Sequence, residues 1–215
     1  FAAKGRPSDH PLIVHVAGAD PAQWRTAVDH YARDLPDFAE RLMVTFWPGP
    51  LTLILRKRAE VPAEVTGGQD TVGLRCPDHP VALALLRAFG GGLAAPSANR
   101  FGHVSPTTAA HVRAEFGDAV PVVLDGGESR VGIESTILDL SGATPRILRP
   151  GMLERHAIEA VIGPVEAGAA GDSPRASGTL DAHYAPRTPL WLLPREAVLH
   201  AANEQSALGQ RVEVL

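Results

Sequence analysis

Two cations on a turn shaped by glycine and proline are the first residues of this chain that suit chemistry. They are Lys4 and Arg6 in Lys4-Gly5-Arg6-Pro7, followed by His10 and His15. Arginine offers a forked pair of donors to an oxyanion, and lysine offers a mobile point charge. Proline restricts the backbone, so both charges can be held ready for a polyanion. Charge alone also fits a solvated surface loop.

Small and polar residues follow a short apolar run in Ala94-Ala95-Pro96-Ser97-Ala98-Asn99. Loops at the carboxyl ends of strands bind ligands in α/β proteins, and small residues let the backbone approach a ligand closely. Ser105 precedes Pro106 and fits the N-cap of a helix, whose free N–H groups also attract phosphate. Each segment alone is equally typical of an ordinary turn or cap.

Glycines mark a third set of segments, Asp125-Gly126-Gly127, Gly132-Ile133-Glu134-Ser135-Thr136 and Arg149-Pro150-Gly151. Glycine allows tight backbone near a binding site. Arg149 stands at the end of a predicted strand, where it would be a second anchoring cation. A single arginine at such a place is more often a surface residue.

Motifs and composition exclude or disfavour several classes of protein. The nine histidines show no His-Glu-x-x-His spacing, and neither a P-loop nor a Gly-x-Ser-x-Gly elbow is present, which argues against zinc hydrolases, P-loop enzymes and serine hydrolases. A net charge of −4 disfavours a protein that mainly wraps nucleic-acid backbone. The single cysteine, Cys76, excludes an internal disulfide and fits a reducing cytosol. No apolar run is long enough to cross a bilayer.

Short apolar segments alternate with amphipathic ones, which predicts an α/β domain with a mixed sheet. Asp20 and Pro21 fit the N-cap and first position of one helix, and Phe46-Trp47-Pro48-Gly49-Pro50 predicts a rigid turn. The predicted strands cover residues 11–16, 51–55, 72–75, 93–95, 120–124, 135–140 and 146–148, and the predicted helices cover residues 21–35, 79–89, 105–116 and 152–162.

The composition shifts to Ala, Gly, Ser and Pro over residues 166–178, which predicts a flexible linker. We therefore expect a first domain at residues 1–163, a linker at 164–187 and the incomplete start of a smaller α/β domain at 188–215. Residues 189–193 would form the first strand of that second domain. Because the chain begins at Phe1 without methionine, we expect it to be a piece of a longer protein.

Several of these segments together resemble the Sua5/YciO/YrdC family, in order and at natural spacing over about residues 1–163. The resemblance rests on Lys4-Gly5-Arg6-Pro7 with Pro11-Leu12-Ile13-Val14-His15, Phe46-Trp47-Pro48-Gly49-Pro50-Leu51-Thr52, Pro96-Ser97-Ala98-Asn99, and Gly132-Ile133-Glu134-Ser135-Thr136 with Arg149-Pro150-Gly151. His183-Tyr184-Ala185-Pro186 resembles the linker of the two-domain Sua5 branch, whereas residues 173–179 depart from its commonest form. The resemblance implies a YrdC-like α/β fold, a twisted mixed sheet with flanking helices around a positively charged cavity.

The resemblance also implies a function, L-threonylcarbamoyladenylate synthase, a cytoplasmic nucleotidyltransferase. It would make threonylcarbamoyl-AMP and pyrophosphate from L-threonine, bicarbonate and ATP with Mg²⁺, for the threonylcarbamoyladenosine (t6A37) modification of tRNA. Downstream tRNA-modification proteins would be its partners, with direct tRNA contact secondary and no membrane involved. Lys4 and Arg6 would be the catalytic cations. The implied ATP-binding residues are Lys4, Arg6, His10, Thr71, Ser97, Asn99, Ser105, Arg149 and Tyr184. The implied threonine-binding residues are His15, Arg75, the backbone of Ala95, and Ser135.

Some alternatives stay open at this point. Arg75 would hold the threonine carboxylate, but the sequence does not choose between His15 and Ser135 for the remaining contacts. The family's early Pro-Thr-x-Thr-x-Tyr-Gly-Leu segment, part of the threonine pocket, would precede Phe1. Two rival functions are a YrdC-like RNA-binding module and a domain that handles carbamoyl-adenylate. Since phosphoryl-type transfer leaves the protein little covalent work, we expect no protein nucleophile.

Overall fold

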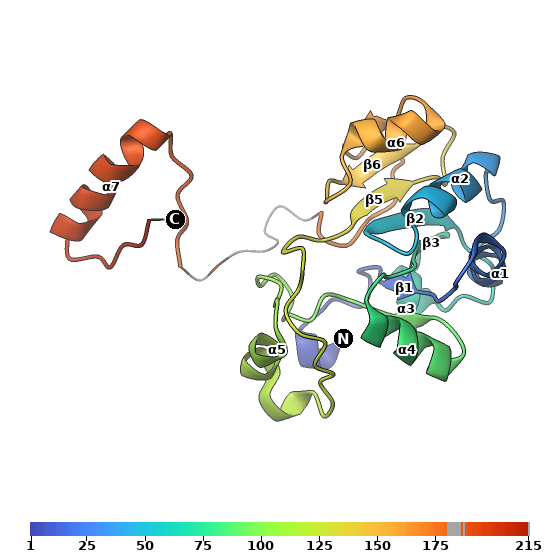
Figure 1. Ribbon diagram of the computed structural model, residues 1–215, viewed down its shortest axis with the longest axis horizontal. Helices are drawn as coiled ribbons and strands as arrows, with labels where there is room; N and C mark the ends of the chain where they lie inside the picture. The colour runs from blue at the N-terminus through green and yellow to red at the C-terminus, as the bar shows by residue number, and fades with distance from the viewer. Residues whose placement is uncertain (180–185, 187, 215) are drawn as a thin grey trace. The chain divides into compact units, whose positions relative to one another are not determined.

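The structure is a computed structural model that describes residues 1–179, 186 and 188–214. The chain divides into two compact units, Phe1–Tyr184 and Ala185–Leu215 (Figure 1). The first unit contains η1 (Ala2–Lys4), β1 (Ile13–His15), α1 (Pro21–Tyr31), α2 (Asp37–Phe46), β2 (Leu51–Arg56), α3 (Ala63–Thr66), β3 (Thr71–Arg75), α4 (Pro80–Phe89), β4 (Leu93–Ala94), α5 (Ala109–Phe116), η2 (Gly117–Ala119), β5 (Thr136–Asp139), β6 (Arg146–Arg149), α6 (Arg155–Ile162) and β7 (Glu166–Ala167).

The first unit is built on one seven-stranded sheet in the order β4-β1-β3-β2-β5-β6-β7. The pairs β1/β3, β2/β5 and β6/β7 are parallel, and β1/β4, β2/β3 and β5/β6 are antiparallel. The prediction of a mixed α/β sheet is therefore confirmed. The central strand β2 is buried from Leu51 to Leu55, because both of its faces are covered.

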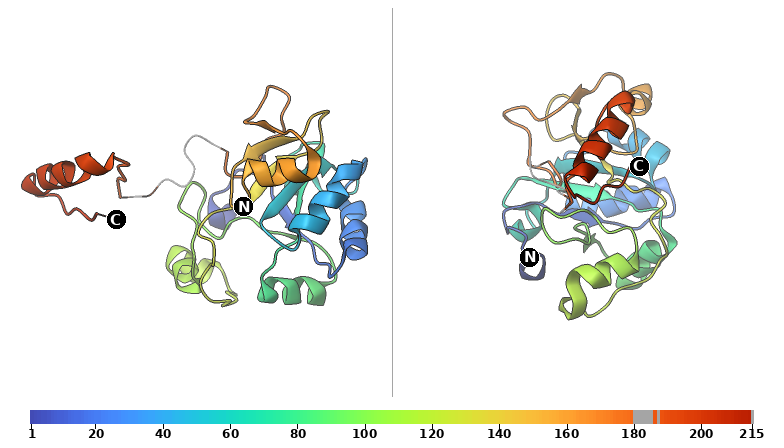
Figure 2. Two further views of the ribbon diagram at one scale, coloured as in Figure 1. Left: turned by 45° about the horizontal axis from the view of Figure 1, so that its top comes forward. Right: turned by 90° about the vertical axis from the view of Figure 1, so that its left-hand side faces the viewer.

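Helices α1, α2 and α6 lie together beside one face of the sheet (Figures 1 and 2). Their apolar side chains join those of the strands in the main core, where Leu42, Leu53, Leu74 and Ile158 are fully buried. Burial of this apolar surface is the main driving force that holds the helices against the sheet. The opposite face of the sheet is left for other segments of the chain.

Local signals explain where the confirmed elements begin and end. Asp20 Oδ1 accepts a hydrogen bond of 2.9 Å from the Gln23 N–H at the start of α1, with Pro21 in the first turn, as predicted. Helix α4 ends at Gly90, which has a positive φ of 76°; this left-handed conformation favours glycine. The predicted strands at residues 51–55, 72–75, 135–140 and 146–148 are confirmed within one or two residues.

Two predictions are wrong, and one helix was not predicted. Residues 120–124 form no strand, because no neighbouring strand pairs with them. Val122 and Leu124 lie exposed, at 68% and 55%. Helix α5 begins after Thr108, whose side chain accepts from the His111 N–H, so Ser105 is not its N-cap. The sequence reading also missed α2, which has Pro36 as N-cap and no side-chain capping bond.

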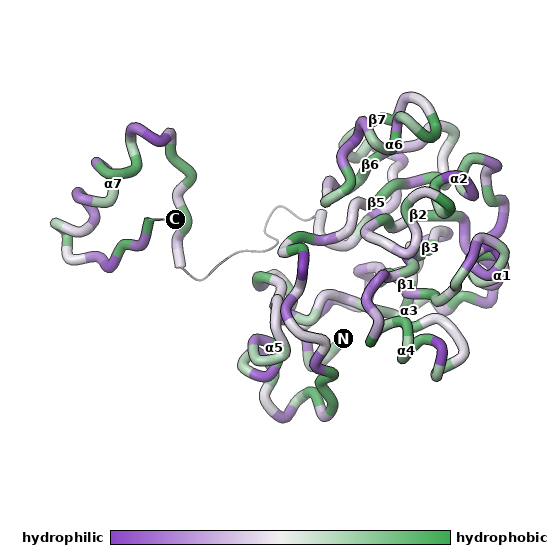
Figure 3. The backbone as a smooth tube through the Cα atoms, viewed as in Figure 1, coloured by the Kyte–Doolittle hydropathy of each residue, from purple (hydrophilic) through white to green (hydrophobic). Residues whose placement is uncertain are grey.

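The second unit contains one described helix, α7 (Arg195–Ala207), which has no buried residue and mixes hydrophilic and hydrophobic segments (Figure 3). Residues 189–193, which are all described, form no strand, so that prediction is also wrong. Leu192 is 98% exposed, and a strand needs a pairing partner that this segment does not have. Among the described residues, every helix is too short or too polar to span a membrane.

Candidate active site

The candidate site lies on the sheet face opposite helices α1, α2 and α6. In β3, Thr71, Gly73 and Arg75 are half-buried and alternate with the buried Val72 and Leu74 of the main core. Because side chains alternate across a strand, the first three residues share the other face. His15 of β1 lies opposite Arg75 in parallel register, so the two residues predicted to bind threonine are neighbours on this face.

Arg6 and Arg149 reach this face from distant parts of the chain and meet at Ser177. Arg6 Nη2 donates to the Pro11 carbonyl at 2.7 Å and to Ser177 Oγ at 3.2 Å. Arg149 Nη1 donates to the Ser177 carbonyl at 2.7 Å. Arg6 is only 8% exposed and Arg149 only 6%, so the two guanidinium groups are held on either side of one serine and away from bulk water.

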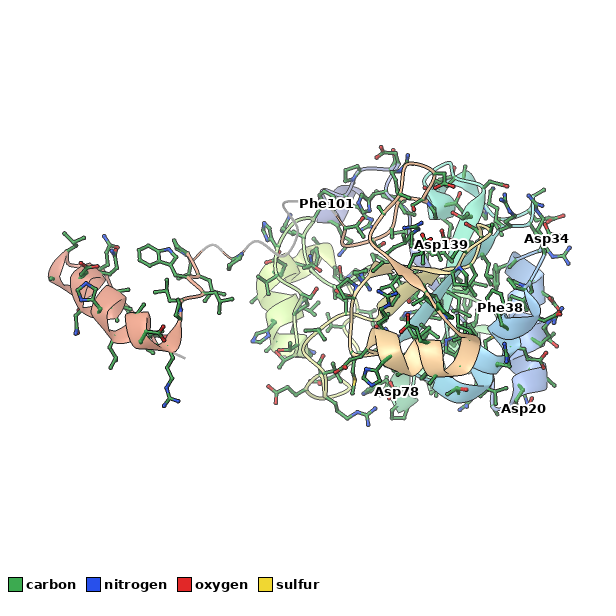
Figure 4. The ribbon with its side chains drawn as sticks, turned by 90° about the horizontal axis from the view of Figure 1, so that it is seen from above. Asp20, Asp34, Phe38, Asp78, Phe101 and Asp139 are labelled. Carbon is green, nitrogen blue, oxygen red and sulfur yellow. The ribbon has the colours of Figure 1, made fainter. Side chains whose placement is uncertain are left out.

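His10 and Phe101 support Arg6. His10 is buried, and its Nδ1 lies 2.9 Å from Arg6 Nη2. The rings of His10 and Phe101 meet edge to face at a centroid distance of 5.3 Å, and the Phe101 N–H donates to the Lys4 carbonyl. Figure 4 shows Phe101 beside the N-terminal segment and α5. Packing and hydrogen bonding therefore fix the direction of the Arg6 side chain before any ligand binds.

Lys4 crosses to the polar loop predicted from the sequence. Its Nζ donates to the Ser97 carbonyl at 2.5 Å and also to the Asn99 carbonyl, and it lies 5.1 Å from the centroid of the Phe116 ring. Burial, and secondly the charge of Arg6, lowers the pKa of Lys4 to about 8. Lys4 is therefore a cation at neutral pH that can lose its charge in mildly alkaline solution.

Ser105 has a different role from the predicted cap. Its Oγ donates to Glu134 Oε1 at 2.8 Å, while Asn99 Oδ1 lies 3.5 Å away. The buried Asn99 uses its amide Nδ2 to donate to the carbonyls of Arg100 and His103. Asn99 thus shapes the loop, and Ser105 links that loop to Glu134.

Ser135 lies at the centre of a buried polar cluster. Its carbonyl accepts from Arg149 Nε and Nη2 at 3.2 and 2.8 Å, and its hydroxyl lies 3.2 Å from the same Nη2. The hydroxyl also pairs with that of the fully buried Thr52 at 2.8 Å. Gly151 packs against this segment so closely that an added Cβ would lie 2.4 Å from the Thr136 nitrogen. Ser135 and Arg149 are thereby locked together.

The pKa values of His15 and Arg75 separate their roles. Burial, followed by the charge of Arg75, lowers the pKa of His15 to about 3, so the free site holds a neutral imidazole. Burial also lowers the pKa of Arg75 below its usual range, while Arg75 Nε donates to the Gly49 carbonyl at 2.9 Å. Arg75 is therefore the fixed cation of this pair, and His15 is a neutral hydrogen-bonding group.

Residues 173–179, here called the strap, lie over the same sheet face. Arg175 N–H donates to Gln69 Oε1 at 2.6 Å, its guanidinium donates to the Gly67 carbonyl at 2.7 Å, and Ala176 is buried in a small apolar cluster. A pocket of about 20 Å³ remains between the strap and Thr71, Gly73 and the adjoining strands, room for about one water molecule. The segment for which composition predicts a flexible linker therefore makes specific contacts here.

Contacts join the predicted residues into two connected groups. One runs from Lys4 through the loop with Ser97, Asn99 and Ser105 to Glu134, Arg149 and Ser135; the other joins Arg6, His10 and Ser177. Arg149 bridges the groups through Ser177. Thr71 lines the strap pocket, the Ala95 N–H is used in a bond to the Ile13 carbonyl, and Tyr184 lies outside the described residues.

Sequence reasoning did not select three residues that the structure places in this network: Thr52, Glu134 and Ser177. Glu134 lies in the motif Gly132-Ile133-Glu134-Ser135-Thr136, so its place directly before the predicted ligand Ser135 could have identified it. Thr52 gave a weaker signal, a hydroxyl in an otherwise apolar strand. Ser177 had none, because its contacts depend on how the strap folds back. Among the described residues, no three His, Cys, Asp or Glu side chains are grouped so that they could hold a metal ion.

Comparison with known proteins identifies the family. The Sua5_yciO_yrdC family model, described as "Telomere recombination", matches residues 1–151, and the model described as "Threonylcarbamoyl-AMP synthase, C-terminal domain" matches residues 152–215. The chain belongs to the Sua5/YciO/YrdC family. This confirms the resemblance inferred from the motifs, and the second model identifies the Sua5 branch. The family model covers every predicted site residue except Tyr184, which falls within the second model.

Individual members of the Sua5/YciO/YrdC family align along the whole chain. A Pyrococcus abyssi protein named threonylcarbamoyl-AMP synthase is 43% identical over 226 residues, and one of that name from Bacillus subtilis is 41% identical over 222 residues. Both alignments cover 100% of this chain, which spans only 65% and 62% of those two proteins. The crystal structure of P. abyssi Sua5 complexed with L-threonine superposes with a TM-score of 0.85 at 40% identity, covering 97% of this chain and 62% of the other.

Proposed function

We propose that this chain carries the catalytic site of an L-threonylcarbamoyladenylate synthase. The observation that carries the proposal is the meeting of the buried Arg6 and Arg149 at Ser177, on the same sheet face as the pair Arg75 and His15. A triphosphate needs fixed cations, and an amino acid needs a partner for its carboxylate. The names of the P. abyssi and B. subtilis relatives, and the threonine bound to the P. abyssi structure, support the same reading.

The chemistry requires alignment and charge neutralisation more than a reactive side chain. The threonine amine can add to carbon dioxide and lose a proton, which gives a carbamate. With bicarbonate, the same N–C bond forms as a C–O bond of bicarbonate breaks, and the amine proton leaves with that oxygen as water. A carbamate oxygen then forms a bond to the α-phosphorus as the bond to pyrophosphate breaks. Both reactants are anions, so positioned cations lower the barrier most. Lys4, Arg6 and Arg149 would bind the phosphates.

The amino acid would lie on the neighbouring strands. Arg75 is the fixed cation and would bind the carboxylate of threonine. His15, which is neutral in the free site, suits the threonine hydroxyl better than its carboxylate, since a neutral imidazole adds no charge. Ser135, which directly precedes β5, would contribute its hydroxyl. In this arrangement the amine would have to point toward the phosphates, where the carbamate reacts.

Mg²⁺ would enter this site with ATP. It usually keeps several water ligands and binds through one or two carboxylates together with substrate phosphates, so a large protein-built cage is not needed. Glu134, which contacts Ser105 and lies 3.8 Å from Arg149, would be the carboxylate that shares it. When bound, the ion would supply charge neutralisation on the triphosphate.

The burial of the arginines disfavours the RNA-binding alternative. A protein that follows a nucleic-acid backbone presents its cations along an exposed surface, whereas Arg6 and Arg149 are less than a tenth exposed. We further propose that the product passes to downstream tRNA-modification proteins in the cytosol. Direct contact with tRNA would be secondary.

The function is tested by incubating the full-length protein with ATP, L-threonine and ¹³C-bicarbonate and following pyrophosphate and the adenylate by mass spectrometry. We expect pyrophosphate release that requires both threonine and bicarbonate, and an adenylate that carries the label. Pyrophosphate release that requires carbamoyl phosphate instead would favour the carbamoyl-adenylate alternative. RNA binding that weakens steeply with salt, without pyrophosphate release, would favour the RNA-binding module.

The lowered pKa of Lys4 predicts a pH dependence of nucleotide binding. Lys4 is charged below its pKa of about 8, so affinity for ATP should be retained at neutral pH and fall as the pH rises through 8 to 9. The loss of one charge-assisted contact corresponds to roughly tenfold weaker binding. Titration calorimetry of Lys4→Arg over the same pH range is the control, because arginine stays charged. An equal decline in both proteins would show that Lys4 is not responsible.

A further inference from the structure

Glu134 is a carboxylate inside a site that otherwise collects cations. Its Oε1 accepts from Ser105 at 2.8 Å, and its Oε2 lies 3.8 Å from Arg149 Nη2, with 27% of the side chain exposed. Its charge also acts on Arg75. Glu134 therefore lies where the residues proposed for ATP adjoin those proposed for threonine.

The backbone holds this carboxylate in place. A Cβ on Gly151 would lie 2.6 Å from the Glu134 carbonyl oxygen, so residues 134–136 are packed directly against the segment that follows β6. Strand β5 begins at Thr136 and is paired on both sides, to β2 and β6. The backbone of Glu134 is thus fixed, and its carboxylate is held by the bond from Ser105 and the ion pair with Arg149.

A fixed negative charge opposes the binding of a free triphosphate. At a few ångströms, two like charges in a partly buried site repel strongly, because less water screens them. In the free site Glu134 pairs with Arg149, but once phosphates bind that arginine the carboxylate repels them unless a cation arrives with the phosphates. A divalent ion carried by the nucleotide has the required charge, and a carboxylate oxygen is one of its preferred ligands.

We propose that Glu134 makes nucleotide binding depend on a divalent cation, so that the site accepts metal-bound ATP and rejects the metal-free form. This inference rests on the proposed function, because it takes the nucleotide site from it. Glu134 is then a specificity-determining residue for the charge state of the nucleotide. The alternative is a purely structural role, in which the carboxylate only orients Ser105 and Arg149. In that case, removing its charge should weaken the binding of metal-free ATP, whereas the proposal predicts tighter binding.

The test measures dissociation constants by titration calorimetry for ATP with excess EDTA and for ATP with excess MgCl₂, using full-length wild type and Glu134→Gln. Glutamine keeps an oxygen that can accept from Ser105 but removes the charge. We expect the variant to bind metal-free ATP about tenfold more tightly than wild type, and its gain from magnesium to shrink by about the same factor. Glu128→Gln, an exposed change of the same type in the preceding segment, should leave both values unchanged.

Several outcomes would overturn the inference. A variant that binds both forms of ATP more weakly, with the magnesium effect unchanged, would show a structural role only. Glu134→Asp keeps the charge, so magnesium should strengthen ATP binding in this variant as much as in wild type. The proposal is also contradicted if Glu134→Asp loses this magnesium effect and Glu134→Gln retains it. If wild type binds no ATP in either condition, the proposed function itself fails, which separates the two results.

Discussion

Arg6→Ala should reduce the ATP-dependent formation of the adenylate by about 10²–10³-fold, the usual effect of removing one positioned donor to a developing anion. The guanidinium of Arg6 is held by the Pro11 carbonyl and Ser177 Oγ, so its charge is fixed where the phosphates are proposed to bind. Steady-state rates of pyrophosphate release with varied ATP give the measurement. We expect both a lower kcat and weaker nucleotide binding, because the Arg6 guanidinium would bind the phosphates in the bound ATP and also in the transition state.

Arg113→Ala is the matched control for this prediction. Arg113 is an exposed cation on α5, so its removal changes the net charge equally without touching the site. Arg113→Ala should keep wild-type rates. Near wild-type turnover of Arg6→Ala, in a protein whose thermal unfolding is unchanged, would count against a phosphate-binding role for Arg6.

Gly151→Ala should both destabilise the protein and impair the site. The new methyl group would lie 2.4 Å from the Thr136 nitrogen and 2.6 Å from the Glu134 carbonyl oxygen. Both atoms belong to the backbone, so no side-chain rotation relieves the clash. Overpacking of this kind costs about 1–3 kcal/mol, which for a chain of this size lowers Tm by roughly 3–10 °C. Because Ser135 and Arg149 bond each other across this contact, activity should fall as well.

Gly142→Ala gives the comparison for the glycine prediction. Gly142 lies in the turn between β5 and β6, and an added Cβ there meets no atom within 4 Å. Differential scanning calorimetry should therefore show an unchanged Tm for Gly142→Ala and a lower Tm for Gly151→Ala. Equal Tm values would mean that the backbone near Gly151 relaxes without cost.

Local signals in the sequence predicted much of the sheet and failed where the outcome depended on tertiary packing. Asp20 and Pro21 identified the start of α1 because capping and proline geometry are local. The apolar residues 120–124 have strand-like composition, yet a strand also needs a neighbour to pair with. Ser105 and Thr108 are both good N-caps by type, and only the position of Glu134 decides that Ser105 turns toward a carboxylate instead.

The sequence predicted the charged residues of the candidate site but not the contacts between them. Arg6 and Arg149 were selected because the family resemblance implies that they bind ATP, whereas their charge beside Gly and Pro alone also fitted surface residues. Their meeting at Ser177 was not predictable, since a segment rich in Ala, Gly and Ser carries no signal for docking. Thr52 was missed for a similar reason: a threonine in a buried strand is ordinary until its hydroxyl is found paired with Ser135.

The central claim is that one triphosphate binds between Arg6 and Arg149. A crystal structure of the full-length protein with a non-hydrolysable ATP analogue, L-threonine and MgCl₂ tests it most directly. We predict phosphate oxygens within hydrogen-bond distance of both guanidinium groups, with the threonine carboxylate on Arg75. A nucleotide bound elsewhere, with Arg6 and Arg149 making no contact to phosphate, would contradict the claim.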